Sequence, residues 1–234
     1  DARALASALI AAGLAPVTSL AGVTEHPALP PGEVRRGGFG GADGLKAYLE
    51  QETIAAVVDA THPFAARMAA QAYLACHALA VPLLRLERPP WQPGEGDRWI
   101  AVSSVAEAVT MLPGGARALV TIGRKEIGAF LARTDIAGVA RMIEPPAAPI
   151  PPLWTLVLER PPFTVESERQ LITRHTITHL VSKNAGGEDT AAKIEAARML
   201  GLPVIMIARP AKPEVPTHHR ETSLVPALRQ MLLP

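Results

Sequence analysis

"LVSKNAGGEDTAAKIEAARMLGLPVIMIA", residues 180–208, contains two apolar strands separated by a glycine-rich loop and an amphipathic helix. One face of the predicted helix is apolar at a spacing of three residues: Ala191, Ile194, Ala197 and Leu200. Asp189 or Thr190 can cap its start, and Gly201 with Pro203 ends it. Two parallel strands need a crossover connection of this kind, usually a helix. The stretch therefore predicts a β-loop-α-β unit of a parallel sheet.

The loop of this unit carries four residues that suit an anionic ligand: Lys183, Asn184, Gly186 and Gly187. In open parallel sheets, ligands bind where the carboxyl ends of strands meet the amino ends of helices, because free N–H groups and the helix dipole favour negative charge. A tight turn whose lysine points to water is the alternative for this loop taken alone. Further loops of the same kind decide between the two interpretations.

Composition and charge exclude several classes of protein. The chain has 234 residues, of which 48% are apolar, so it can bury one large core or two small ones. A net charge of +1 and only three Trp, two Tyr and four Phe residues argue against a nucleic-acid binder. No apolar stretch reaches the roughly 20 residues of a membrane span. We expect a soluble, cytoplasmic protein, because nothing resembles a signal peptide.

The single cysteine, Cys76, excludes an internal disulfide and any metal site built from several cysteines. We expect it to be a buried, small apolar residue within a helix. His218 and His219 lie in a proline-flanked segment and are expected to be exposed, and no cluster of ligands supports a metal.

Strand and helix patterns alternate along the whole chain. The predicted elements are strands near 16–20, 33–37, 54–60, 81–87, 116–122, 139–143 and 154–158, and helices near 1–12, 43–51, 65–79, 105–112, 126–131, 165–174 and 224–232. A proline-rich break, "ERPPWQPGEGDRW" (87–99), separates two such series. We predict an α/β fold with two Rossmann-like, doubly wound parallel-sheet domains, 1–98 and 99–234, and a cleft between them.

The first predicted element is a helix, which Asp1 can cap and Gly13 can end. A helix followed by a strand is how the second half of a βαβ unit reads. We therefore expect the first strand of the domain 1–98, with its glycine-rich phosphate-facing turn, to lie upstream of Asp1.

"VVDATHPFA" (57–65) ends a predicted buried strand with Asp59, Thr61 and His62, and Pro63 lies close to the next helix. A ligand at this strand end would contact all three polar residues. His62 could donate a hydrogen bond or a proton near neutral pH, but a histidine in this place is as often a capping group.

Two further segments of the first domain favour a nucleotide. "GGFGG" (37–41) permits positive φ and a close approach of the backbone to a planar ligand, although a mobile turn is the alternative. In "TSLAG" (18–22), Ser19, Ala21 and Gly22 are neutral where an NAD-binding domain carries an acid for the ribose. If this domain binds a dinucleotide, NADPH is therefore the better fit.

"VTIGRKE" (120–126) repeats the pattern of strand, loop and helix in the second domain. Thr121 and Gly123 close a buried strand, and Arg124 with Lys125 stands where the next helix begins. Two cations at this position predict an anionic ligand, and solvated surface charge is the competing explanation. Arg88 and Arg209 can add to the same positive field.

Six segments, taken in order, resemble the precorrin-6A reductase family of cobalamin biosynthesis: "SLAG", "RRGGFGG", "DATHPFA", "RLERPPW", "TIGRKE" and "LVSKNAGG". The resemblance covers nearly the whole chain. It implies two Rossmann-like domains, NADPH as the hydride donor, and reduction of one carbon-carbon double bond of the macrocycle to give precorrin-6B.

The resemblance also implies roles for residues. NADPH is expected on the first domain, at Ser19, Ala21, Gly22, Arg36, Gly38, Phe39, Gly40, Asp59, Ala60, Thr61 and Pro63. Either Arg35 or Arg36 would contact its phosphate, because Val23 stands where the family often carries a basic residue. The carboxylates of the tetrapyrrole are expected on Arg88, Arg124, Lys125, Lys183, Asn184, Gly186, Gly187 and Arg209. His62 or a bound water would supply the proton.

Two other functions fit a chain of two such domains. One is a nucleotide-sensing module without catalysis, and the other is a group transferase with a nucleotide donor. The reductase interpretation further suggests that the product is handed to the next enzyme of the pathway.

Overall fold

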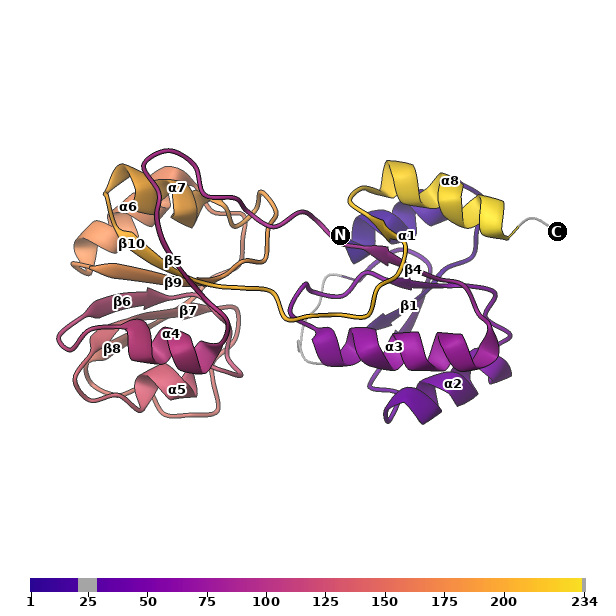
Figure 1. Cartoon of the computed structure of the whole chain (residues 1–234), viewed down its shortest axis with the longest axis horizontal. Helices are drawn as coiled ribbons and strands as arrows, with labels where there is room; N and C mark the ends of the chain where they lie inside the picture. Colours follow the sequence, from indigo (N-terminus) through magenta and orange to yellow (C-terminus); the bar gives the residue numbers. More distant parts are fainter. Residues whose placement is uncertain (21–28, 233–234) are drawn as a thin grey trace. The chain divides into compact units, whose positions relative to one another are not determined.

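The computed structural model describes residues 1–20 and 29–232 and has an α/β fold in which every strand pairing is parallel (Figure 1). The predicted fold class is thereby confirmed. Ala21, Gly22 and Val23 lie outside the described residues. The chain divides into two compact units, a first unit of Asp1–Pro89 with Pro210–Pro234 and a second unit of Pro90–Arg209.

Both boundaries of the second unit, Pro90 and Arg209, differ from those of the predicted domains 1–98 and 99–234. Strand β5 (Arg98–Val102) pairs with β10 (Pro203–Ile207), so the chain has entered the second unit at Pro90, within the proline-rich break. Near its end the chain returns, because β11 (Thr217–His218) pairs with β4 (Leu83–Leu86) of the first unit. A strand of two residues has no hydrophobic period, which is why sequence patterns missed the return.

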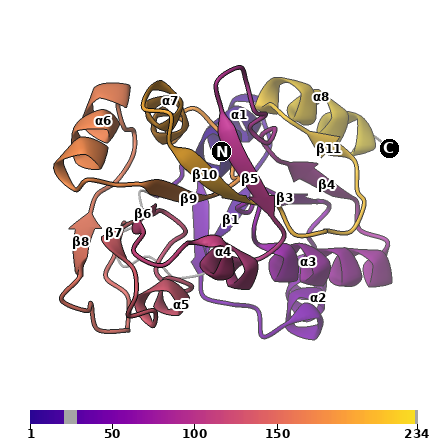
Figure 2. The same cartoon turned by 60° about the vertical axis from the view of Figure 1, so that its left-hand side comes forward.

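The second unit is a six-stranded sheet in the order β5-β10-β9-β6-β7-β8. Its other strands are β6 (Arg117–Val120), β7 (Ala137–Met142), β8 (Trp154–Leu158) and β9 (His179–Lys183). Helices α6 (Val165–Arg174) and α7 (Ala192–Met199) cover one face, and α4 (Val105–Met111) and α5 (Gly128–Leu131) cover the other (Figures 1 and 2). The unit is therefore a doubly wound, three-layer structure.

The central strands of this sheet are apolar along their whole length because both faces are covered. Leu119, Val120, Leu180 and Ile205 have no exposed surface. Polar side chains cap two of the helices: the Ser104 side chain accepts from the Glu107 amide to start α4, and Thr164 and Ser167 form a capping box at the start of α6. Helix α7 has Ala191 as its N-cap and no side-chain cap, so the prediction that Asp189 or Thr190 caps it is wrong.

The first unit contains two parallel sheets, one of β1 (Val17–Leu20) with β2 (Glu33–Arg36), and one in the order β11-β4-β3, with β3 at Val57–Asp59. Both orders occur within the doubly wound order 3-2-1-4-5-6.

Helices cover both faces of the first unit. Leucines of α1 (Ala2–Ala11) and α8 (Glu221–Met231) share one apolar cluster with β4. A second cluster joins α2 (Ala42–Gln51) to α3 (Ala66–Leu79) and includes Cys76. Cys76 is 1% exposed, and burial raises the pKa of its thiol to about 11, so the prediction of a buried apolar residue is confirmed.

Among residues 1–20 and 29–232, no helix is both long and apolar enough to cross a lipid bilayer. The same residues contain no group of three or more His, Cys, Asp and Glu side chains that could hold a metal ion.

Candidate functional site

Cations follow three adjacent strands of the second unit. Lys183 ends β9, Arg124 and Lys125 follow β6, and Arg209 follows β10. Strands β10, β9 and β6 are neighbours in the sheet and run parallel, so these residues lie at one carboxyl edge. The sequence predicted each of these cations separately, and the structure brings them to the edge at which parallel sheets bind ligands.

Two carboxylates pair with these cations. Lys183 forms an ion pair with Glu126, and Arg124 Nη1 lies 3.1 Å from Glu144 Oε2. Lys125 is exposed. Sequence reasoning missed both acids, although Glu126 is the last residue of the "TIGRKE" segment. The edge is therefore a set of cations that are partly neutralised by the protein itself.

Asn184 and Arg209 build the loop that follows Lys183. The Asn184 side chain accepts from the Trp91 amide (2.8 Å) and donates to the Trp91 carbonyl (3.0 Å), and Trp91 Nε1 donates to the Gly187 carbonyl (3.0 Å). Arg209 donates to the carbonyls of Asn184 (2.9 Å) and Ala185 (3.1 Å). These groups hold the loop in shape, and a direct role of Asn184, Gly187 or Arg209 in binding substrate stays a prediction.

Lys193 is a buried cation beneath this loop that sequence reasoning did not single out. It is 4% exposed, its Nζ donates to the Thr190 carbonyl (2.6 Å), and it lies 4.5 Å from the centre of the Trp91 ring. Gly186 and Gly187 have φ values of 67° and 88°, which side chains rarely adopt. Lys193 thus holds the loop through Thr190 and Trp91, and the two glycines turn its backbone at the edge of the sheet.

A buried ion pair supports the same edge from the side of β7. Arg141 Nη2 lies 2.7 Å from Glu168 Oε1 of α6, with side-chain exposures of 5% and 0%. The guanidinium also stacks 4.0 Å from the Phe163 ring, and the Phe163 amide donates to the Asp189 carbonyl (3.2 Å). Phe163 therefore links the loop before α6 to the loop before α7, and Arg141 of the buried pair packs on its ring.

In the first unit, Asp59 is a buried carboxylate that shapes its own turn. Its Oδ1 accepts from the Thr61 amide (3.1 Å) and hydroxyl (2.6 Å), and its Oδ2 accepts from Arg85 Nε (3.0 Å). Arg85 also donates to the Pro213 carbonyl (3.1 Å). Both Asp59 oxygens are engaged within the protein, so the backbone of Ala60 and Thr61 is what the turn can offer a ligand.

His62 is exposed, and its Nδ1 accepts a hydrogen bond from the Phe64 amide at 3.2 Å. This contact lies in the turn before α3, whose N-cap residue is Ala65 without a side-chain cap, so His62 does not cap the helix. Pro63 is buried next to it. A catalytic role of His62 stays a prediction.

Arg35 organises the "GGFGG" turn. It donates to the carbonyls of Gly37 (2.6 Å) and Gly38 (3.0 Å) and to Ser19 Oγ (3.3 Å), and its guanidinium stacks 3.9 Å from the Phe39 ring. Arg36 is exposed at the end of β2. Of the two arginines considered for a phosphate, Arg36 therefore has the open side chain.

The backbone of this turn requires glycine at specific places. Gly40 and Gly41 have φ values of 79° and 109°, as the sequence predicted. A Cβ on Gly44 of α2 would lie 1.7 Å from the Phe39 carbonyl oxygen, so the helix can approach the turn only because this residue is glycine.

Three other residues considered in the sequence lie apart from the cations of the second unit and from the two turns of the first unit. Arg88 belongs to the first unit, where it pairs with Asp1, whereas the other predicted substrate-binding cations belong to the second unit. His218 Nδ1 contacts Ser223 Oγ (3.2 Å), and His219 Nδ1 contacts the Glu87 carbonyl (2.7 Å). Both histidines thus serve local contacts near β11.

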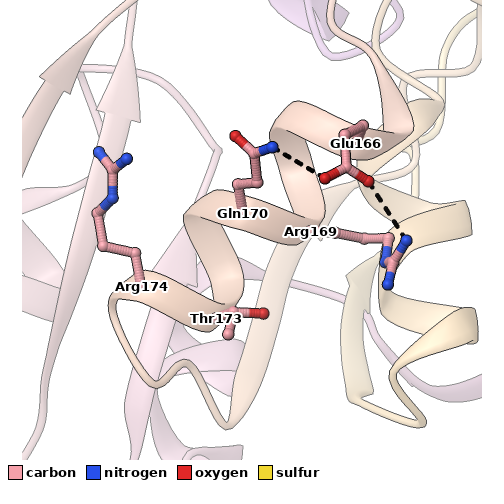
Figure 3. A pocket seen from close by; sticks show the side chains of 5 residues that line it. All are labelled: Glu166, Arg169, Gln170, Thr173 and Arg174. Carbon is pink, nitrogen blue, oxygen red and sulfur yellow. Dashed lines mark hydrogen bonds and ion pairs between the residues drawn. The ribbon is translucent and has the colours of Figure 1, made fainter.

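A shallow pocket on the outer face of α6 contains none of the predicted residues (Figure 3). It is lined by Glu166, Arg169, Gln170, Thr173 and Arg174. Glu166 accepts from Arg169 (3.3 Å) and Gln170 (2.8 Å) along the helix. All five side chains come from one exposed helix face, so we assign the candidate site to the carboxyl edge of the sheet.

Fold and site define a Rossmann-like α/β protein of two units, the second of which brings several cations to the carboxyl edge of its sheet. The family described as "Precorrin-6x reductase CbiJ/CobK" matches residues 1–229. The chain belongs to this family.

Relatives and a solved structure agree with this assignment. The chain is 46% identical over 215 residues to "Precorrin-6A reductase" of Rhodococcus erythropolis, covering 91% of this chain and 87% of the relative. Identity to the protein of the same name from Rhodobacter capsulatus is also 46%, with coverage of 91% and 86%. A structure of "CobK precorrin-6A reductase" superimposes with a TM-score of 0.92 at 42% identity, covering 98% of this chain and 92% of that one.

Proposed function

We propose that this protein reduces precorrin-6A with NADPH to give precorrin-6B in cobalamin biosynthesis. Membership of the precorrin-6x reductase family supports the reaction. The observation that carries the proposal is the set of cations, Lys183, Arg124 and Lys125, that the adjacent parallel strands β9 and β6 bring to one edge. A corrin precursor carries acetate and propionate carboxylates, which such cations bind by charge-assisted hydrogen bonds.

NADPH fits the residues at the carboxyl edge of β1 and β2. Leu20 and Arg36 are partners in the strand register, so the neutral end of β1 lies beside an exposed arginine. The described part of β1 has no acid that would repel a ribose phosphate. We propose that Arg36 holds this phosphate and that Ser19 and the turn Gly38–Phe39–Gly40 line the cofactor.

The second contact with the cofactor is the turn after β3. Asp59 and Arg85 hold this turn, and Ala60, Thr61 and Pro63 face the cofactor in our proposal. When bound, NADPH supplies a hydride to one carbon of the double bond, and a proton completes the neighbouring carbon. His62 is the candidate donor of that proton from the protein, and water is the alternative.

On the second unit, we assign binding of the substrate's carboxylates to Lys183, Arg124 and Lys125, together with the backbone at Gly186. Asn184, Gly187 and Arg209 keep the loop in position. Catalysis then depends mainly on orientation, which contributes up to about 7 to 11 kcal/mol when reacting groups are aligned.

The proposal predicts that the purified protein bleaches the chromophore of precorrin-6A only when NADPH is present. A nucleotide sensor would bind NADPH without turnover, and a group transferase would consume a group donor instead. Absorption spectra of the tetrapyrrole, recorded with and without NADPH, separate the three functions. Binding of both ligands without loss of NADPH would reject the reductase.

Lys183→Ala and Lys125→Ala test the assignment of the substrate to the second unit. For Lys183→Ala we expect the KM for precorrin-6A to rise about tenfold, because the substrate loses a charge-assisted hydrogen bond of about 1.5 kcal/mol. For Lys125→Ala we expect a smaller rise, because this side chain is exposed. The KM for NADPH should change less than twofold. Lys46→Ala, on α2 of the first unit, controls for the loss of a lysine. Equal losses for both ligands, or none, would refute the assignment.

We also propose that the enzyme works in the cytoplasm and hands its product to the next enzyme of the pathway. Family membership supports the shared pathway. Cell fractionation tests the location. For the hand-over, product that exchanges freely with added precorrin-6B before the next step would count against direct transfer.

A further inference from the structure

We propose that Glu126 competes with a substrate carboxylate for Lys183 and so determines how tightly the tetrapyrrole binds. This inference rests on the proposed function. It assigns a role to an acidic residue in a site whose ligand is itself an acid.

Geometry places Glu126 where the substrate's carboxylate has to bind. Strands β6 and β9 are paired neighbours, with Val120 opposite Val181. Lys183 ends β9, and Glu126 lies in the loop that follows β6, so their ion pair joins two adjacent strand ends. A ligand that reaches the Lys183 ammonium from this edge meets the Glu126 carboxylate.

Exposure shows which partner can move away. The Lys183 side chain is 14% exposed, whereas that of Glu126 is 41% exposed. The cation is enclosed and the carboxylate is open to solvent. An incoming carboxylate can therefore displace Glu126, which regains its hydration, while Lys183 stays in place.

The neighbouring pair has the opposite arrangement. Arg124 is 36% exposed and its partner Glu144 only 17%. A guanidinium has five N–H donors and can bind two carboxylates along different edges, whereas an ammonium is a compact point charge. We infer that the enclosed Glu144 orients the more exposed Arg124, and that Glu126 occupies the charge that the substrate needs.

The competition has a physical benefit for the protein. A partly buried ammonium without a counter-charge is costly, and Glu126 supplies that counter-charge before the substrate arrives. A neutral ligand cannot replace this counter-charge. The pair thus favours polyanionic ligands over neutral ones at the expense of some affinity.

Glu126→Gln tests this inference, because it removes the competing charge at nearly unchanged shape. We expect the KM for precorrin-6A to fall about two- to fivefold, the range that one ion pair of this exposure supports. The KM for NADPH should not fall with it. Glu195→Gln, which removes an exposed carboxylate of α7 that interacts with Arg198, should leave both values unchanged. Glu144→Gln should not lower the KM for precorrin-6A.

Two results for Glu126→Gln would overturn the inference: an unchanged KM for precorrin-6A would mean that Glu126 does not compete, and a raised KM would mean that it holds Lys183 for the substrate. Glu126→Ala, measured in parallel, shows whether the KM for precorrin-6A falls or rises if the glutamine variant folds poorly. Turnover by the wild-type protein reports on the proposed function, and the ratio of variant to wild-type KM reports on the competition. The two failures are therefore distinguishable.

Discussion

Gly138→Ala is expected to destabilise the second unit severely. Gly138 is in β7, and a Cβ at this position would lie 1.9 Å from the Ala118 carbonyl oxygen of β6 and 2.8 Å from two other Ala118 backbone atoms. The obstacle is the backbone of a neighbouring strand, which no change of rotamer can move. The φ of 151° is also one that side chains rarely adopt.

Relief of this contact requires that β6 and β7 separate. Strand β6, with its neighbour β9, contributes Leu119 and Leu180 to the main apolar cluster of the second unit. We expect the free energy of unfolding to fall by about 4 kcal/mol or more, a large share of the stability of a domain. Urea denaturation followed by circular dichroism measures it. Gly128→Ala is the matched control, because its Cβ meets no atom within 4 Å, and it should stay within about 1 kcal/mol of wild type. A Gly138→Ala protein with the wild-type midpoint would contradict the packing of β6 against β7.

Arg141→Met is expected to cost about 3 to 5 kcal/mol, because it leaves the fully buried carboxylate of Glu168 without its counter-charge. The loss includes the stacking of the guanidinium on Phe163. The double variant Arg141→Met with Glu168→Leu should recover most of the stability, since an apolar pair of similar volume removes the buried charge altogether.

Denaturation of the single and double variants forms the test. Arg169→Met is the control, because its ion pair with Glu166 is exposed at 43% and 63% and such pairs contribute about 0 to 1 kcal/mol. If Arg141→Met loses no more stability than Arg169→Met, or if the double variant is no more stable than the single one, the account of the buried pair is wrong.

The sequence predicted the parallel α/β fold because its signals are local. Apolar runs such as that ending at Val120 and crossover helices such as that after Lys183 follow one another along the chain, and parallel pairing follows from their order. The return of the last segment to β4 was missed, because β11 has only two residues. The pair of Arg141 and Glu168 was missed for another reason, since it joins a strand to a helix that is not its sequence neighbour.

For the candidate site, the sequence placed each cation near the end of a strand but predicted neither which strands are neighbours nor what each side chain contacts. Lys183 ends β9 and Arg124 follows the neighbouring β6. Their partners Glu126 and Glu144 are evident only from the structure. Asn184 was singled out as a ligand contact, and its amide bonds to the Trp91 backbone. A polar side chain at a strand end can serve the ligand or the loop, and hydrogen bonds across the fold decide between them.

Hydride transfer from NADPH to precorrin-6A on this protein is tested most directly by NADPH that carries deuterium at both C4 positions of the dihydronicotinamide, because an enzyme transfers the hydrogen of one face only. Mass spectrometry of the tetrapyrrole after reaction should find a single deuterium on the reduced macrocycle, with NADP formed in equal amount. Precorrin-6A recovered unchanged, or a reduced product without deuterium, would contradict the claim.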